Sequence, residues 1–254
     1  MLVVRRGREV MMSLGKLPLG IAIACLCTAV PARAASLQVQ PAMVDVAAPG
    51  AAATITLRND GQAPINVQVR VFRWTQVDGE ERLEPTDDVV ASPPEVMLPP
   101  QVDYVARIVR VVKQPVVGEE TYRLLVDELP DSAQLRTNTI RLLVRHSIPV
   151  FFATQDRAPP SIIWSLSKQG ERLILSARNE GDAHLRLSAL SLRDRGGKTI
   201  SFGRGLVGYA LGRSTMRWTV PGGVHGFAAT GSASISGQSN EGPLAATASV
   251  VANP

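Results

Sequence analysis

Hydrophobic and polar side chains alternate with a period of two along much of this 254-residue chain. Such alternation, with many β-branched residues, is typical of β-strands that bury one face. The clearest runs are residues 54–57, 65–74, 102–112, 122–129, 162–166, 172–177, 185–192 and 216–220. Turn-forming pairs such as Pro49-Gly50 and Asp78-Gly79 lie between runs, and no long stretch has a helical period. The sequence therefore predicts an all-β protein.

Residues 138–152, NTIRLLVRHSIPVFF, predict an edge strand. By period two, one face carries Ile140, Leu142, Val144, Ile148 and Val150. The other face carries Arg141, Leu143, Arg145 and Ser147. Pro149 cannot donate to a sheet ladder, which confines this run to an edge, a bulge or a strand end. A long apolar edge recruits other strands, so it indicates either an ordinary sandwich edge or a strand lent to a partner.

An internal repeat predicts two domains of one kind. The segment 57–65, LRNDGQAPI, has a counterpart 120 residues later in 177–185, ARNEGDAHL. This offset fits the size of an immunoglobulin-like sandwich. In each copy Asn-acid-Gly is expected to form a turn after a strand, with Asn as the cap and Gly at positive φ.

The first 34 residues have the features of a secretory signal. A basic start precedes the apolar run 17–30, and Ala32-Arg33-Ala34 is a small-x-small cleavage site. We expect cleavage after Ala34, secretion of the mature chain and no stable insertion in the membrane. The predicted signal holds both cysteines, five of the 27 basic residues and one of the 22 acidic residues, so 22 basic and 21 acidic residues remain. A nearly neutral mature chain gives no reason to expect nucleic acid as a partner.

Four segments follow from these patterns: the signal (1–34), an N-terminal immunoglobulin-like domain (35–152), a linker (153–160) and a C-terminal immunoglobulin-like domain (161–254). The linker contains Pro159-Pro160, which makes it stiff. The tail after Gly222 is rich in Gly, Ala and Ser, and it holds either a last strand near 245–252 or loosely ordered chain.

The sequence contains no recognisable catalytic constellation. The histidines His146, His184 and His225 are isolated along the chain, whereas metal sites in sandwiches use clustered ligands. Nucleophile, phosphate-loop and dinucleotide motifs are absent. His146 and Ser147 are adjacent, so on a strand they point to opposite faces. We therefore expect a protein that is not an enzyme and that uses no metal or cofactor.

Several motifs together resemble the periplasmic pilus-assembly chaperones of the chaperone–usher pathway, in particular the archaic branch associated with spore-coat-U-like proteins. These motifs are SLQVQP (36–41), NDG (59–61), FRW (72–74), PP (93–94), RIV (107–109), YRLLVDELP (122–130) and SIPVF (147–151). They span most of the first predicted domain in the family's order, and the second domain resembles the family only loosely.

The resemblance implies two immunoglobulin-like sandwiches in an L-shaped arrangement that bind a pilus subunit. The last strand of the first domain would complete the unfinished fold of the subunit, a known form of strand addition. On this interpretation Ile140, Leu142, Leu143, Val144 and Ile148 are the candidate subunit-binding residues, and either face is open as the donated one. The bound subunit would pass to an outer-membrane usher, and the unpaired edge favours self-association of the free protein.

One position departs from the family pattern. The family holds the subunit's terminal carboxylate with two basic residues, and the first is expected just after Pro41, where this chain has Met43. The candidate anchors are instead Arg141, Arg145, Arg107 and Arg123. The alternative to a chaperone is a secreted structural protein or adhesin with two immunoglobulin-like domains.

Overall fold

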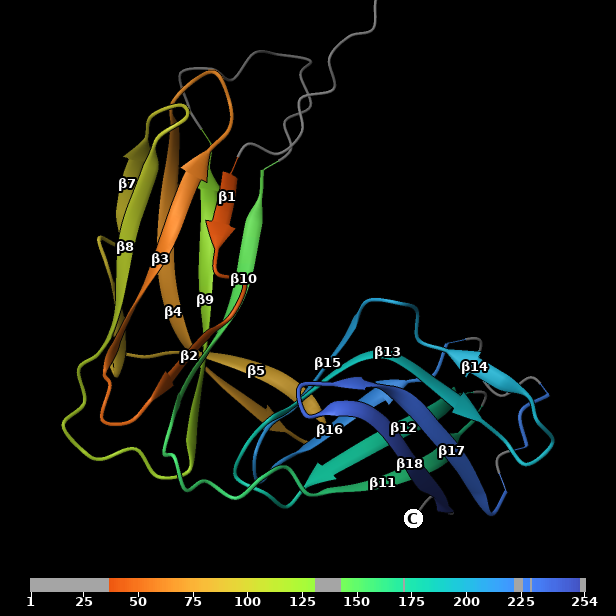
Figure 1. The fold of residues 1–254 in the computed structure, drawn as a ribbon. Helices are drawn as coiled ribbons and strands as arrows, with labels where there is room; N and C mark the ends of the chain where they lie inside the picture. Colours follow the sequence, from red (N-terminus) through yellow and green to blue (C-terminus); the bar gives the residue numbers. More distant parts are fainter. Residues whose placement is uncertain (1–36, 131–142, 171, 222–225, 229, 252–254) are drawn as a thin grey trace, which may run out of the picture. The chain divides into compact units, whose positions relative to one another are not determined.

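The computed structural model describes residues 37–130, 143–170, 172–221, 226–228 and 230–251. These residues form 18 strands, and the described ranges contain no helix. The strands build two β-sandwiches, the first from β1–β10 and the second from β11–β18 (Figure 1). The predicted all-β class with two sandwiches is confirmed, while the predicted domain limits stay a prediction. Within the described ranges, no helix is long and apolar enough to cross a membrane.

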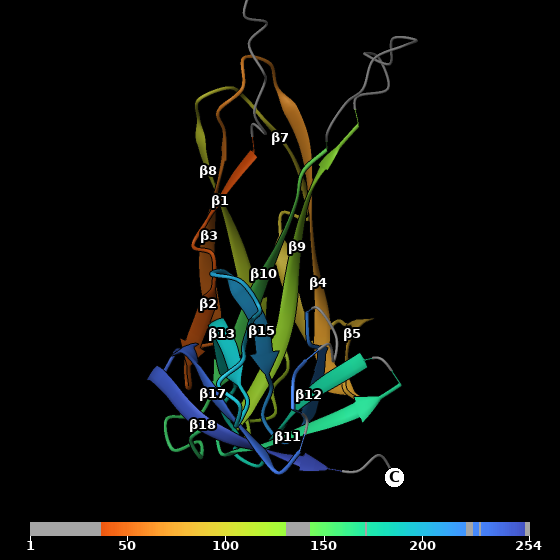
Figure 2. The same ribbon diagram turned by 90° about the vertical axis from the view of Figure 1, so that its right-hand side faces the viewer.

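The first sandwich consists of two sheets. One sheet has the order β1-β3-β8-β6, formed by Leu37–Gln40, Ala52–Asn59, Asp103–Arg110 and Val89–Ser92. The other has the order β2-β10-β9-β4-β5, formed by Val44–Ala47, Arg145–Ala153, Glu119–Leu129, Ile65–Val77 and Glu80–Pro85, with β7 (Glu95–Leu98) beside β4. In Figure 2, β10, β9 and β4 run side by side in that order.

The core of this sandwich follows from the period-two pattern. In β9, Tyr122, Leu124 and Val126 have no exposed surface and pack in one cluster, with Val67 and Val69 of β4 beside them. Arg123, Leu125 and Asp127, which alternate with the three β9 residues, therefore lie on the outer face of the five-strand path. That outer face is the one relevant to function.

The second sandwich has the strand order β14-β13-β17-β18-β11-β12-β16, with β15 paired to β13. Its strands are Ile162–Gln169, Arg172–Asn179, Leu185–Arg193, Thr199–Ser201, Leu206–Ala210, Thr215–Thr219, Ser232–Ser239 and Gly242–Val251, in chain order. The pairing register of β13 shifts near Ala189, whose φ is 49°. β15 pairs with Leu185–Ser188 of β13 and β14 with Ser191–Arg193, on either side of this irregularity, while β17 pairs with both parts.

The Asn-acid-Gly repeat makes equivalent contacts in both sandwiches. The Asn59 amide donates to the carbonyls of Ala63 and Leu98, at 2.8 and 3.1 Å, and Asn179 donates to Ala183 and Ala210 at the same distances. The Oδ1 atom of each asparagine accepts the amide of the glycine two residues later. The repeat is therefore a structural one.

The prediction of positive φ at the two repeat glycines was wrong. Gly61 and Gly181 are not among the glycines with positive φ, because the asparagine side chain closes the turn without it. Gly181 is needed for another reason. A Cβ atom there would lie 1.9 Å from the carbonyl oxygen of Pro159, so only glycine fits.

Candidate functional site

The strand β10 has an open edge along its first half. All of Arg145–Ala153 pairs with β9, whereas β2 joins the other side only from Val150 to Ala153. Among the described residues, 145–149 therefore have one strand neighbour (Figure 1). Pro149 lies at the end of this open part, which fits its inability to donate to a ladder. The edge-strand prediction thus holds for half of the strand.

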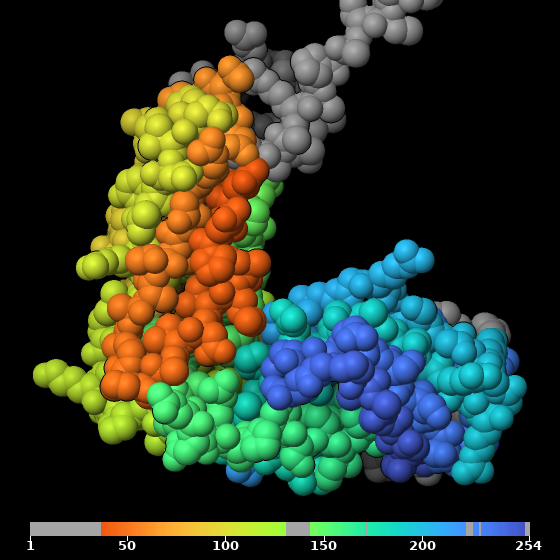
Figure 3. All heavy atoms as spheres, in the orientation of Figure 1, coloured from red at the N-terminus to blue at the C-terminus, as the bar shows by residue number. Residues whose placement is uncertain are grey.

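The open edge exists because the chain changes sheets near its start. β1 pairs with β3 in one sheet, and after Pro41 the chain crosses so that β2 pairs with β10 in the other. His146 Nε2 lies 3.0 Å from the Leu37 carbonyl oxygen, so β1 passes close to the open edge. In Figure 3 the green atoms of β10 accordingly line the margin of the first sandwich beside the orange atoms of β1.

The candidate subunit-binding residues fall into three groups. Ile140 and Leu142 lie outside the described residues. Leu143 and Val144 directly precede β10; the Leu143 side chain is 46% exposed, and the Val144 carbonyl accepts the Glu128 amide at 2.9 Å. Ile148 is only 4% exposed and packs in the first core, so its side chain is already occupied within this chain.

Two arginines on the outer face share one carboxylate: Arg145 on the edge strand β10, and Arg70 on β4, two strands away from it. Arg145 on β10 is directly opposite Asp127 on β9, and its Nε donates to Asp127 Oδ1. Arg70 on β4 donates to Asp127 Oδ2 at 2.7 Å. Burial alone would raise the pKa of Asp127, but the hydrogen bonds from Arg145 and Arg70 outweigh burial and hold that pKa below its usual range. One ionised carboxylate therefore holds two guanidinium groups.

Arg123 occupies a different environment on the same face. Its guanidinium carbon lies 3.7 Å from the ring centroid of Trp74 and 5.3 Å from that of Tyr209. Burial lowers the pKa of Arg123, and Glu81, at 3.5 Å, acts in the opposite direction. Arg123 is paired in register with Pro149, so it lies at the level where the open edge ends.

The other two anchor candidates are separated from this face or undescribed. Arg107 is exposed on β8, in the sheet that does not contain β10. Arg141 lies outside the described residues. Met43, where the family pattern has a basic residue, packs against the buried cluster of Trp74, Phe151, Tyr209 and Leu211.

The two sandwiches meet at this aromatic cluster. The rings of Phe151 and His184 are stacked with centroids 3.7 Å apart, and the Glu119 carboxylate accepts both the His184 backbone amide and its Nδ1, each at 2.9 Å. Gln76 at the end of β4 donates to the Tyr209 carbonyl at 2.7 Å and accepts the Leu211 amide at 3.0 Å. These contacts explain why a lone histidine is buried, and they give it a packing role.

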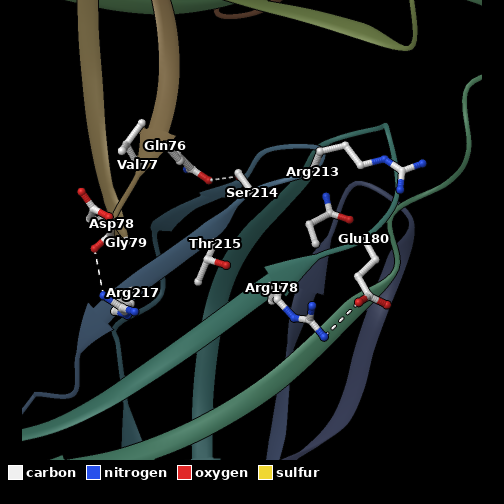
Figure 4. Close-up of a pocket in the computed structure, with 11 residues that line it drawn as sticks. Gln76, Val77, Asp78, Gly79, Arg178, Glu180, Arg213, Ser214, Thr215 and Arg217 are labelled. Atoms are coloured by element: carbon white, nitrogen blue, oxygen red, sulfur yellow. Dashed lines mark hydrogen bonds and ion pairs between the residues drawn. The ribbon is translucent and has the colours of Figure 1, made fainter. Parts of the chain in front are cut away.

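A depression beside this junction contains several charged side chains (Figure 4). Arg178 pairs with Glu180 at 2.9 Å, and Arg217 donates to the Asp78 carbonyl at 2.9 Å. Gln76 accepts the Ser214 hydroxyl at 2.9 Å. These contacts join the β4–β5 hairpin to the second sandwich.

The described residues contain no group of three or more His, Cys, Asp or Glu side chains that could hold a metal ion. The sheet of β10, β9 and β4 instead has an open strand edge, an exposed apolar side chain at Leu143, and three arginines held on its outer face by neighbouring groups, Arg145, Arg70 and Arg123. Sequence patterns identified Arg145 and Arg123 but missed Arg70 and Asp127 as a unit. A single sequence does not reveal which strands are neighbours, and the one signal was that Arg70 falls on the polar side of its run.

Comparison with known families identifies the first sandwich. Residues 36–156 match the family described as pili and flagellar-assembly chaperone, PapD N-terminal domain. A comparison with curated proteins gave no match.

Solved structures share the fold of both sandwiches. One is the CsuC–CsuE chaperone–tip adhesion subunit pre-assembly complex of archaic Csu pili from Acinetobacter baumannii, with TM-score 0.65, 23% identity, and 87% of this chain and 100% of that chain covered. The YadV chaperone matches with TM-score 0.59 and 16% identity, covering 84% and 99%. The Salmonella enterica SafA pilin–SafB chaperone complex matches with TM-score 0.57 and 18% identity, covering 85% and 96%.

The family match spans the sandwich that carries the open edge, and the fold agreement extends over most of the chain. The first sandwich of this chain is therefore similar to the PapD N-terminal domain of pili and flagellar-assembly chaperones, and the fold of both sandwiches is shared with the solved structures.

Proposed function

We propose that this protein is a periplasmic chaperone that binds a pilus or coat-like subunit along the open edge of β10 and delivers it to an outer-membrane usher. The observation that carries the proposal is the one-sided pairing of residues 145–149. Backbone groups on such an edge can pair with an incoming strand and supply affinity, while side chains supply specificity. This function needs no catalytic group or cofactor, and the basic, apolar start of the chain serves its export.

The subunit-contacting side chains are those that precede and begin β10. Leu143 is the best supported, because it is exposed and directly continues the open edge. Val144 is partly buried and contributes less. Ile140 and Leu142 remain proposed from the sequence pattern, whereas Ile148 is withdrawn because its side chain belongs to the core.

Arg123 is the proposed anchor for the terminal carboxylate of the subunit. It lies beside the end of the open edge, where a strand added next to β10 would be stopped by β2. Trp74 and Tyr209 fix the plane of the guanidinium by cation–π contact, which leaves its edge for a carboxylate. Glu81, the present partner at 3.5 Å, would have to move away.

The test is capture of the client from periplasmic extract of the protein's own source, read by mass spectrometry. We expect the tagged protein to recover a small, exported, β-rich partner in about stoichiometric amount. Leu143→Glu should abolish capture while the fold persists. The matched control is Ile163→Glu on β11, since Ile163 is exposed to the same 46% but lies in the second sandwich.

Two outcomes would contradict the proposal. Equal capture by Leu143→Glu and Ile163→Glu would exclude the open edge as the binding element. Recovery of the wild-type protein alone, as a monomer or a fibre, would favour the alternative of a secreted structural protein or adhesin.

A further inference from the structure

The Arg145–Asp127–Arg70 cluster is built to receive one more anion. Asp127 is 7% exposed and neutralises one of the two guanidinium groups, so the cluster keeps a net charge of +1. Arg145 binds Asp127 through Nε, and Arg70 through one terminal nitrogen. Because a guanidinium has five N–H donors, both arginines keep donors for a second carboxylate.

The same carboxylate also limits how the two arginines move. The side chains of Arg145 and Arg70 are 61% and 42% exposed, and long exposed side chains usually lose entropy when they bind. Asp127 holds both from the strand between them, and Arg70 also lies 5.5 Å from the Phe72 ring centroid. The donors are therefore oriented before a ligand arrives.

The position of the cluster relative to Arg123 fixes what it would meet. Arg145 is opposite Asp127 and Pro149 is opposite Arg123, a separation of four residues along β10. At about 3.3 Å per residue, this corresponds to roughly 13 Å. A strand that fills the open edge and ends beside Arg123 must run parallel to β10, because β2 blocks the edge from Val150 onward.

We propose that Arg145, oriented by Asp127, whose charge Arg70 neutralises, recognises an acidic side chain on the last strand of the client subunit, about four residues before its C-terminus. This inference rests on the proposed function, since it assumes that a client strand occupies the edge. An even spacing places the acidic side chain on the same outer face as the arginines, whereas an odd spacing turns it to the opposite face.

The probe is a set of synthetic ten-residue peptides of alternating Thr and Val with a free terminal carboxylate. One carries Glu four residues before the terminus, a second carries Gln there, a third carries Glu three residues before it, and a fourth is the first peptide as a C-terminal amide. Binding to the purified protein is measured by titration calorimetry at low and moderate salt.

We expect the Glu peptide to bind about three- to tenfold more tightly than the Gln peptide, as for a partly exposed ion pair strengthened by two donors. The difference should vanish in an Arg70→Gln, Arg145→Gln double variant. It should persist in Arg107→Gln, which removes one exposed arginine from the sheet that lacks β10. The inference would be overturned if the double variant preferred the Glu peptide over the Gln peptide as strongly as the wild type does. It would also be overturned if the peptide with Glu three residues before its terminus bound as tightly as the one with Glu four residues before it.

The amide peptide separates this inference from the function on which it rests. If amidation lowers the affinity for the wild-type protein but not for Arg123→Gln, the result supports Arg123 as the anchor of the terminal carboxylate. If amidation has no effect while the Glu preference persists, the Arg123 anchor fails and the acidic recognition stands. If none of the peptides binds at millimolar concentration, the edge does not accept a strand and both ideas fail.

Discussion

Replacing either repeat asparagine with alanine should destabilise the sandwich that contains it, and by a similar amount. Asn59 and Asn179 are 0% and 1% exposed; the Asn59 side chain makes three hydrogen bonds to backbone groups, and the Asn179 side chain makes four. Each variant leaves two carbonyl groups without their side-chain partner, together with one amide in Asn59→Ala and two amides in Asn179→Ala. A net hydrogen bond contributes about 0.5–1.5 kcal/mol, and orphaned buried groups add to this, so we expect a loss of about 3 kcal/mol.

A third variant tests whether the donor side of the amide matters. Asn59→Asp preserves the shape and the acceptor for the Gly61 amide, but it places a carboxylate against two carbonyl oxygens. A buried charge without a donor is costly, so at neutral pH this variant should be at least as unstable as Asn59→Ala. Protonation at acidic pH should reduce the difference between the two variants.

The assay is urea unfolding followed by circular dichroism, together with peptide-resolved hydrogen exchange. Exchange reports local opening, so it assigns the loss to one sandwich or the other. We expect Asn59→Ala to lower protection mainly in β1–β10 and Asn179→Ala mainly in β11–β18. A loss below about 1 kcal/mol in either variant would refute the role assigned to the asparagine, since it is smaller than one orphaned buried group.

Three further predictions concern acid stability, a tight turn and the junction. Burial alone would raise the pKa of Glu120, but the hydrogen bonds from Arg110 and Tyr122 keep that pKa below its ordinary value. The ionised Glu120 carboxylate therefore contributes fully to stability above pH ~4.3, and this contribution is lost as pH falls below that value. In thermal scans, the stability of Glu120→Gln should depend less on pH between pH 5 and 3 than that of the wild type. Gly181→Ala should strongly lower the melting temperature, whereas Gly205→Ala, where nothing lies within 4 Å of the added Cβ, should leave it nearly unchanged. Gln76→Ala should separate the unfolding transitions of the two sandwiches in calorimetry, because Gln76 donates one hydrogen bond and accepts two across their junction. A single transition, unchanged from the wild type, would contradict this prediction.

The strand pattern predicted the fold well because burial on one face imposes period two. The run that begins at Ile65 alternates over its first seven residues, and β4, which it starts, is a central strand. The Asn-acid-Gly repeat correctly predicted a turn closed by asparagine in each sandwich, although positive φ at its glycines was wrongly predicted.

Which face of β10 packs in the core could not be predicted from the sequence, because both faces are buried near the end of the strand. Ile148 and Val150 pack in the first core, while Phe151 packs on the other side against Trp74 and Tyr209. Apolar residues at consecutive positions erase the alternation that distinguishes core from surface. The outer face is apolar at Phe151 because it packs there against Tyr209 of the second sandwich. No local sequence pattern reveals this contact.

Met43 and Arg123 together account for the absence of the basic residue that the family pattern places just after Pro41. The segment between β1 and β2 brings residue 43 to the aromatic junction, where methionine packs beside Trp74 and Phe151. A basic side chain in that place would lie near Arg123, whose guanidinium already covers the Trp74 ring at 3.7 Å. Two cations so close would repel each other, so an apolar residue at position 43 is the complement of an arginine on β9. On the proposed function, the positive charge has moved from the first strand to β9, next to the same end of the open edge.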